Sequence, residues 1–229
     1  MRTPRPWRRL LVVATTVAAL TAPSAVAAPP LALPDAASAK VDWVGSWAVA
    51  VTPPSPSGLS ATGVTDTTLR QVAHLSVGGA EIRLRLSNVY GTKPLVVGKV
   101  TVTPRSDDAA GTPTVEPAKL VPVTFDGRPS ATIPMGAEWV SDPVRITVPD
   151  DTDLVISTYF PGPTGPLTQH PAGYATAFSA AGDRTTDTGT AYTSVGQSRY
   201  VIDFLRCARI NPARFFSLSS SSLRPRMPR

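Results

Sequence analysis

The chain has 229 residues, including 25 prolines and 16 glycines; a proline share of about 11%, twice the usual value, excludes long helices and favours strands and turns. Its single cysteine excludes an internal disulfide. The formal net charge of +6 comes from the two ends, because residues 1–27 carry four arginines, residues 206–229 carry six, and neither segment has an acid. The residues between them hold 12 basic and 16 acidic side chains, so we expect no basic binding face on the body and no nucleic-acid partner.

The first 27 residues have the features of a secretory signal peptide. A basic start precedes an apolar run at 10–20, and Ala25 and Ala27 form an A-x-A cleavage pattern. A membrane anchor is the alternative reading, but a span needs about 20 apolar residues and this run is shorter. We therefore expect an extracellular protein, exported by the general route or, through the arginine pair at 8–9, by the twin-arginine route. Residues 28–40 are rich in alanine and proline and predict a flexible lead-in. No later segment is apolar enough to span a bilayer.

From Val41 onward the sequence consists of short alternating runs separated by Gly, Pro and Asp. In EIRLRLSN the apolar residues Ile82, Leu84 and Leu86 alternate with polar ones, which is typical of a strand with one buried face. The preceding run, TLRQVAHLSV, reaches this strand through Gly78-Gly79, a pair suited to the positive φ angles of a tight turn. The pattern predicts that these two strands form an antiparallel hairpin.

The rest of the body continues in the same way. Asp126-Gly127 separates LVPVTF from RPSATI and predicts a second hairpin with a type I′ turn. Further strand-like runs reach RYVIDF, interrupted by the proline-rich loop PGPTGPLTQHP. We expect about ten strands, no core helices, and an all-β, antiparallel two-sheet β-sandwich of jelly-roll type over residues 41–205.

Residues that could catalyse hydrolysis are scarce. The run YTSVG is a near miss to the nucleophile elbow, with Tyr192 in place of the first glycine, so Ser194 is interpreted as an ordinary exposed serine. His74 lies in a strand-like run and is expected to have a structural or surface role. His170 lies in the proline-rich loop, where function is more common, but it has no partner at a recognisable spacing. The residues alone therefore identify no catalytic group.

No metal or cofactor site is predicted either. Two distant histidines and one cysteine offer no ligand cluster. The acidic cluster of Asp150, Asp151 and Asp153 lacks the glycine and terminal glutamate of a calcium loop and is interpreted as a solvated turn. Aromatic residues could form a sugar-stacking platform, although aromatics in strands more often belong to a core. The candidates are Trp43, Trp47, Tyr90, Trp139 and Tyr159.

Four stretches in a fixed order resemble the N-terminal region of secreted bacterial hydrolases of the SGNH/GDSL type. They are WVGSWAVA, TLRQVAHLSVGGAEIRLRLSNVYGTKPL, VTFDGRPSATIPMGAEWVSDPV and LVISTYFPGPTGPLTQHP. The resemblance covers residues 41–205. It implies an esterase- or lipase-like enzyme in which such a β domain precedes a catalytic α/β domain.

The catalytic motifs of that family do not carry over to this chain. The nucleophile of the family lies in a Gly-Asp-Ser block, whereas the only Gly-Asp pair here, at 182–183, is followed by Arg184. Neither His74 nor His170 has an aspartate three residues before it, so the Asp-x-x-His pair is absent as well. The resemblance therefore predicts a chain that is inactive alone.

Residues 206–229 differ from the body. The alternation ends after Leu205, and Cys207 and a series of arginines follow. Pro212 interrupts the one helix-like run, and the segment is too short to form a catalytic domain. Two interpretations remain open, a natural disordered basic extension or the product of a frameshift or premature stop.

Three functions are compatible with these observations. The main hypothesis is a non-catalytic β-sandwich that supports a separate catalytic domain, and assists its binding of a polysaccharide or lipid ester; it predicts an apolar, poorly covered face. The alternative is a free-standing carbohydrate-binding module, and a third is an unfamiliar enzyme that uses His170. We select four residues as candidate contacts with a ligand or with the catalytic domain: Trp47, Asn88, Tyr90 and His170.

Overall fold

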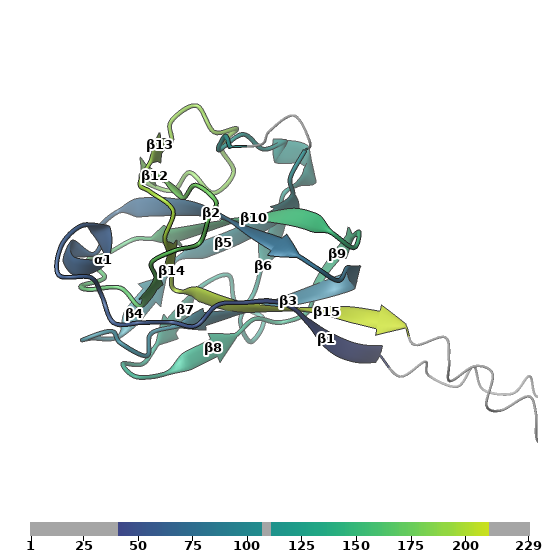
Figure 1. Cartoon of the computed structure of the whole chain (residues 1–229), viewed down its shortest axis with the longest axis horizontal. Helices are drawn as coiled ribbons and strands as arrows, with labels where there is room; N and C mark the ends of the chain where they lie inside the picture. The colour runs from purple at the N-terminus through teal and green to yellow at the C-terminus, as the bar shows by residue number, and fades with distance from the viewer. Residues whose placement is uncertain (1–40, 107–110, 211–229) are drawn as a thin grey trace, which may run out of the picture. The chain divides into compact units, whose positions relative to one another are not determined.

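The computed structural model describes residues 41–106 and 111–210, and these residues form two packed antiparallel sheets with small additions (Figure 1). This architecture confirms the predicted all-β fold without core helices. The predicted signal peptide (1–27), the lead-in (28–40) and residues 211–229 of the predicted tail lie outside the described residues.

One sheet has five strands in the order β1-β15-β3-β8, and β9 also pairs with β3. Its strands are β1 (Val41–Ala48), β15 (Ile202–Ile210), β3 (Gly79–Ser87), β8 (Glu138–Val140) and β9 (Val144–Val148). The first and last described strands are therefore neighbours, and β15 lies between β1 and β3 (Figure 1).

The other sheet has six strands in the order β13-β12-β2-β10-β5-β6. Its strands are β13 (Thr193–Ser194), β12 (Phe178–Ala181), β2 (Thr67–Leu75), β10 (Thr152–Phe160), β5 (Lys99–Pro104) and β6 (Val121–Val123). Two small sheets pair β11 (Gln169–His170) with β14 (Arg199–Tyr200) and β4 (Leu95–Val97) with β7 (Ala131–Ile133). The described helices are two single turns, α1 (Leu59–Thr62) and η2 (Pro117–Lys119).

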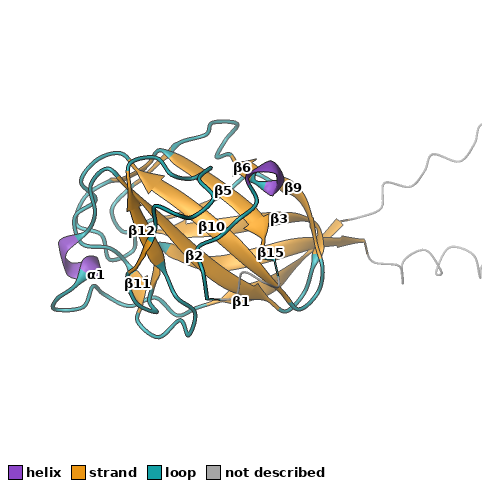
Figure 2. Ribbon diagram, turned by 90° about the horizontal axis from the view of Figure 1, so that it is seen from above, coloured by secondary structure: helices purple, strands orange, loops and turns teal. Residues whose placement is uncertain are grey.

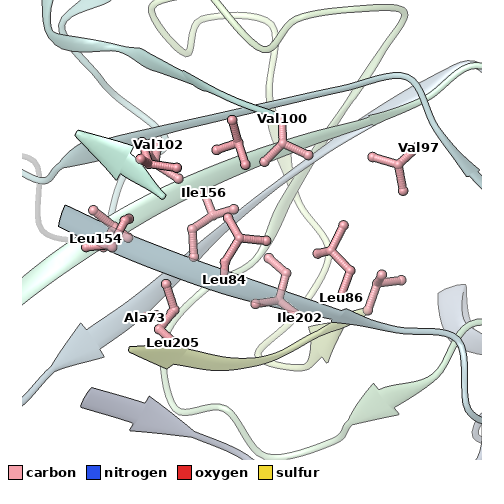
Figure 3. Packing of buried hydrophobic residues seen from close by; sticks show 14 of the residues in the cluster. Ala73, Leu84, Leu86, Val97, Val100, Val102, Leu154, Ile156, Ile202 and Leu205 are labelled. Atoms are coloured by element: carbon pink, nitrogen blue, oxygen red, sulfur yellow. The ribbon is translucent and has the colours of Figure 1, made fainter. Parts of the chain in front are cut away.

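The core lies between the two large sheets (Figure 3). Leu84 of β3 and Leu205 of β15 meet Ile156 of β10 there, and all three are fully or almost fully buried. The alternation predicted for EIRLRLSN is confirmed, since its apolar residues are inaccessible to solvent while Arg83 and Arg85 stay partly exposed. Alternation along each strand thus assigns one face of each sheet to the core.

The predicted hairpin between β2 and β3 is wrong, because the two strands belong to different sheets. Gly78 and Gly79 do not have positive φ angles. They are glycines because the backbone of neighbouring strands passes very close: a Cβ on Gly78 would overlap the carbonyl oxygen of Val148 in β9, and one on Gly79 would overlap that of Ala208 in β15. The pair therefore permits the close approach of two strands of the sheet that β3 joins, instead of forming a turn.

The predicted turn at Asp126-Gly127 is confirmed, but its hairpin is not. Both residues have positive φ, 50° and 74°, and Phe125 and Arg128 exchange two backbone hydrogen bonds across them. These are the features of a type I′ turn. The flanking strands then separate, because β6 pairs with β5 and β7 pairs with β4.

The two large sheets differ in what covers their outer faces. On the six-stranded sheet, Arg70 of β2 points outward yet is fully buried, because loops cover it and supply the carbonyl oxygens of Pro113 (2.6 Å) and Asp187 (2.9 Å). The ring of Tyr192 stacks on its guanidinium group. Figures 1 and 2 show these loops over β2 and β10, on the side away from the five-stranded sheet. On the five-stranded sheet, by contrast, the outward side chains of Trp43, Arg83, Arg85, Phe204 and Arg206 are all partly exposed.

The predicted domain boundary at residue 205 is wrong. Strand β15 continues to Ile210, paired with β1 on one side and with β3 on the other. Cys207 packs in the core opposite Ile82 and is fully buried, and Ala208 is 5% exposed. Burial raises the pKa of the Cys207 thiol, which makes this cysteine an unreactive core residue. The start of the expected tail is thus an integral part of the sandwich.

This boundary can be tested by comparing a chain that ends after Ile210 with one that ends after Leu205. We expect the shorter chain to lose about 3 kcal/mol or more of its free energy of unfolding, because it loses two buried side chains and the hydrogen bonds of a central strand. Urea unfolding followed by tryptophan fluorescence measures the difference. Equal stability of the two chains would place the domain end back at residue 205.

Candidate functional site

The most distinctive surface of the described residues is the outer face of the five-stranded sheet, which we call the arginine–aromatic face. It consists of Trp43, Arg83, Arg85, Glu138, Asp203, Phe204 and Arg206. The strand period produces it, since Arg83 and Arg85 alternate with the core residues of β3, and Phe204 and Arg206 alternate with those of β15.

An ion pair between a partly exposed arginine and a buried aspartate lies at one end of this face. Asp203 is 1% exposed and accepts two hydrogen bonds from Arg85, from Nε at 3.0 Å and from Nη2 at 2.8 Å. Arg85 also contacts Glu138 through Nη1, at 3.1 Å. Removal from water raises the pKa of Asp203 to about 6, and the Glu138 carboxyl beside it adds to the rise while Arg85 opposes it.

The backbone around Asp203 is irregular. The pairing of β15 with β3 shifts between Ile202 and Phe204, so Asp203 is the extra residue of a β-bulge. The preceding residue, Val201, is 2% exposed and has a φ of 68°, a left-handed conformation that β-branched residues seldom adopt. The bulge is what allows the Asp203 carboxylate to lie against Arg85.

Two further arginines share one indole ring at the other end of the face. The guanidinium groups of Arg83 and Arg206 lie 5.0 Å and 5.3 Å from the centre of the Trp43 ring. Their Cα atoms are direct partners across β3 and β15. Neither side chain has a carboxylate within 4 Å among the described residues, and Nε of Arg83 is buried without an acceptor.

Phe204 lies between the two groups of arginines. Its ring covers Gly45 of β1, where a Cβ would lie 3.4 Å from the ring, and the guanidinium of Arg85 lies 5.4 Å from the ring centre. Because β1 has no side chain at Gly45, the ring can lie flat on the sheet. The face therefore alternates aromatic and cationic groups from Trp43 to Arg85.

The charge of each segment did not reveal this surface, because Arg206 was counted with the tail. Arg83, Arg85 and Arg206 gather on one sheet, with the acids Glu138 and Asp203 beside Arg85. An apolar uncovered face was expected, whereas the uncovered face is built of arginines and aromatic rings. Of the exposed large apolar residues, Val140 lies opposite Arg85 and Val41 and Val44 lie on β1 of the same sheet, whereas Val96, Met135 and Tyr174 lie on other elements.

The structure does not gather the four predicted contact residues on this face. Trp47 follows a bulge in β1 and packs partly buried against the core. Asn88 is 3% exposed, and its Nδ2 donates to the carbonyls of Lys93, Ile133 and Pro134, which gives it a structural role.

Tyr90 lies on a loop beside the short strand β11, which ends at His170. Tyr90 is 39% exposed, and its backbone N–H donates to Thr168 Oγ1 at 3.0 Å. Nδ1 of His170 lies 2.8 Å from the carbonyl oxygen of Ala50, which is its only hydrogen bond among the described residues. Among residues 41–106 and 111–210, neither side chain hydrogen-bonds to a carboxylate, a hydroxyl or a thiol.

His74 is held between two acids on the surface. Its Nδ1 lies 2.9 Å from Asp153 and its Nε2 lies 3.0 Å from Asp151. The hydrogen bond to Asp153, and to a smaller extent the one to Asp151, raises the pKa of His74. A ring protonated on both nitrogens can donate one hydrogen bond to each carboxylate. An imidazolium in this arrangement has no free lone pair and cannot act as a general base, so the surface role expected for His74 fits its position.

No hydrolytic apparatus forms within residues 41–106 and 111–210. Neither described histidine hydrogen-bonds to a hydroxyl or a thiol. Ser194 is an exposed residue of the short strand β13, as interpreted from the sequence. In the same residues no three metal-ligating side chains come together, and no helix is long and apolar enough to cross a membrane.

The aromatic residues considered as a sugar platform are dispersed. Trp43 lies on the arginine–aromatic face, whereas Trp47 and Trp139 pack against the core. Tyr159 donates its hydroxyl to Asp66 at 2.8 Å on the six-stranded sheet. These five residues are therefore not gathered on one surface.

Comparison with known proteins adds no assignment: no protein-family model matches the chain, and no curated protein matches it.

The neighbouring carboxyl groups of Asp203 and Glu138 predict how the stability of the fold depends on pH. Because the folded-state pKa of Asp203 lies above its ordinary value of 3.8, this group contributes stability at low pH that is lost as the pH rises through about 6. Replacing Glu138→Gln removes a neighbouring negative charge, so we expect the pKa of Asp203 to fall by about one pH unit and this loss of stability to shrink.

Carbon-13 NMR of the Asp203 carboxyl against pH measures the change. Glu81→Gln is the matched control, since Glu81 pairs with Arg145 on the same sheet at 3.7 Å and takes no part in the Asp203 cluster. An Asp203 pKa that does not respond to Glu138→Gln would show that the two carboxyls are not coupled.

Proposed function

We propose that this chain is the non-catalytic β-sandwich portion of a secreted hydrolase of the SGNH/GDSL type, and that it binds a catalytic α/β domain through the arginine–aromatic face. The single observation that carries the proposal is the difference between the two sheets. Loops cover the outer face of the six-stranded sheet, while the five-stranded sheet leaves Trp43, Phe204 and its arginines partly exposed.

The composition of this face supports a protein partner. Tryptophan and arginine are enriched among the residues that contribute most to protein–protein binding, and aromatic rings are enriched at the centres of interfaces. Here Trp43 and Phe204 are held in place by stacking on guanidinium groups, so little side-chain entropy remains to be lost on binding. The face also lies on regular strands, which keep its shape fixed.

No nucleophile–base pair forms among the described residues. This favours a role in which the sandwich assists a catalytic domain instead of catalysing hydrolysis itself. Ester hydrolysis requires a hydroxyl or thiol activated by an adjacent base. In this proposal the partner domain supplies both, and the sandwich positions that domain and assists binding of a polysaccharide or lipid ester. The signal-peptide pattern at 1–27 supports export of the assembled enzyme.

Binding to a catalytic domain tests this proposal. The probe is the purified catalytic domain of a secreted SGNH/GDSL hydrolase whose own N-terminal region contains the four stretches quoted above. We expect the chain to bind it, and to show no saturable turnover of p-nitrophenyl acetate by itself.

Two matched variants locate the interface. Val140 lies on β8 opposite Arg85 and is 40% exposed, while Val96 on β4 is 45% exposed away from this face. Val140→Lys should weaken binding about tenfold or more, because it places a second, unpaired cation beside Arg85 inside the interface, and Val96→Lys should change it less than twofold. Absence of binding, or robust turnover by the isolated chain, contradicts the proposal.

A further inference from the structure

We propose that Arg83 and Arg206, stacked on Trp43, form a binding site for a carboxylate that the partner protein inserts between their guanidinium groups. The inference rests on the proposed function, because it names the chemistry by which the partner recognises the arginine–aromatic face. It assigns a ligand to the one arginine pair of this face that has no acid of its own.

The register of the sheet brings the two arginines together. Arg83 and Arg206 are direct Cα partners on adjacent central strands, and both side chains point away from the core. Side chains at such positions have Cβ atoms about 5 Å apart. Both guanidinium groups also lie within 5.3 Å of one indole centre, so Trp43 fixes their orientation.

This arrangement leaves two like charges facing each other, which destabilises a sheet unless an anion lies between them. The acids nearby are engaged elsewhere. The charge of Arg83 helps to lower the pKa of Asp142. However, one carboxylate oxygen of Asp142 already accepts hydrogen bonds from Thr124 Oγ1 (2.7 Å) and from the N–H of Gly127 (2.8 Å). Glu81 pairs with Arg145 at 3.7 Å. The donors of the arginine pair are therefore available to an external acceptor.

The same face contains an arginine that already binds a carboxylate of this chain. Arg85, two residues from Arg83 on the same strand, holds Asp203 through two parallel hydrogen bonds. A planar guanidinium matches a carboxylate in this geometry, and two such groups can bind its two oxygens. The chain supplies the carboxylate for Arg85 but not for Arg83 and Arg206.

The shape of the surface favours a protein carboxylate over the carboxylate of an acidic sugar. Two guanidinium groups already lie against the Trp43 ring and occupy part of the surface on which a sugar ring would stack. The surface around it is an open sheet face with partly buried aromatic rings, typical of the centre of a protein interface. An Asp or Glu side chain on the partner fits this setting.

An acidic peptide tests the site without the partner domain. The probe is a capped hexaglutamate peptide, titrated into the whole chain at low salt by isothermal titration calorimetry. We expect binding that weakens about tenfold or more in Arg83→Gln and in Arg206→Gln. Arg145→Gln, which removes the same charge from a 92% exposed side chain on the same sheet, should change the affinity less than twofold.

Arg206→Lys separates geometry from charge. It keeps the positive charge but removes the planar fork, so the affinity should fall severalfold although the net charge is unchanged. Thermal unfolding of each variant verifies the fold; if Arg83→Gln does not fold, the two Arg206 variants decide the question alone.

Three outcomes overturn the inference: no binding of hexaglutamate, equal losses in Arg145→Gln and Arg206→Gln, or tighter binding of oligogalacturonate than of hexaglutamate. Failure here with intact binding of the catalytic domain would remove the carboxylate site and keep the proposed function. Peptide binding at the arginine pair without binding of the catalytic domain would do the reverse.

Discussion

The bulge at Asp203, held by the ion pair with Arg85, determines which side chains of β15 face the core. A slip of one residue in a strand exchanges its two faces. The bulge absorbs one residue, so that Leu205 and Cys207 enter the core while Phe204 and Arg206 face outward. Removing Arg85 would leave the buried Asp203 carboxylate without its partner, and it would also release the constraint on the central strand of the sheet.

This constraint explains why the two sheets have different roles. The six-stranded sheet buries its outward arginine, Arg70, under loops that satisfy it with backbone carbonyls. The five-stranded sheet keeps its arginines on an open surface, one paired internally and two stacked on Trp43. The outer face of the six-stranded sheet is thus covered by the chain's own loops, whereas the outer face of the five-stranded sheet is suited to binding a partner.

The sequence predicted the fold class well because alternation is a local signal, visible in residues 82–86 and confirmed by their burial. Pairing was predicted poorly, since Gly78-Gly79 suits a tight turn and the close approach of neighbouring strands equally, and only the position of the distant strands β9 and β15 distinguishes them. The boundary at 205 was wrong because Cys207 reads as an isolated thiol until β1 and β3 are placed beside it. Segment charges could not reveal the arginine–aromatic face, which joins residues 43, 83 and 206 from three strands.

The central claim is that the arginine–aromatic face is the surface that meets another protein. Hydroxyl-radical footprinting with mass spectrometry, on the chain alone and with the catalytic domain, tests it most directly. The account predicts that oxidation of Trp43 and Phe204 falls on binding while oxidation of Tyr174, an 88% exposed residue on the loop-covered side, does not change. Protection of Tyr174 with unchanged oxidation of Trp43 and Phe204 would contradict it.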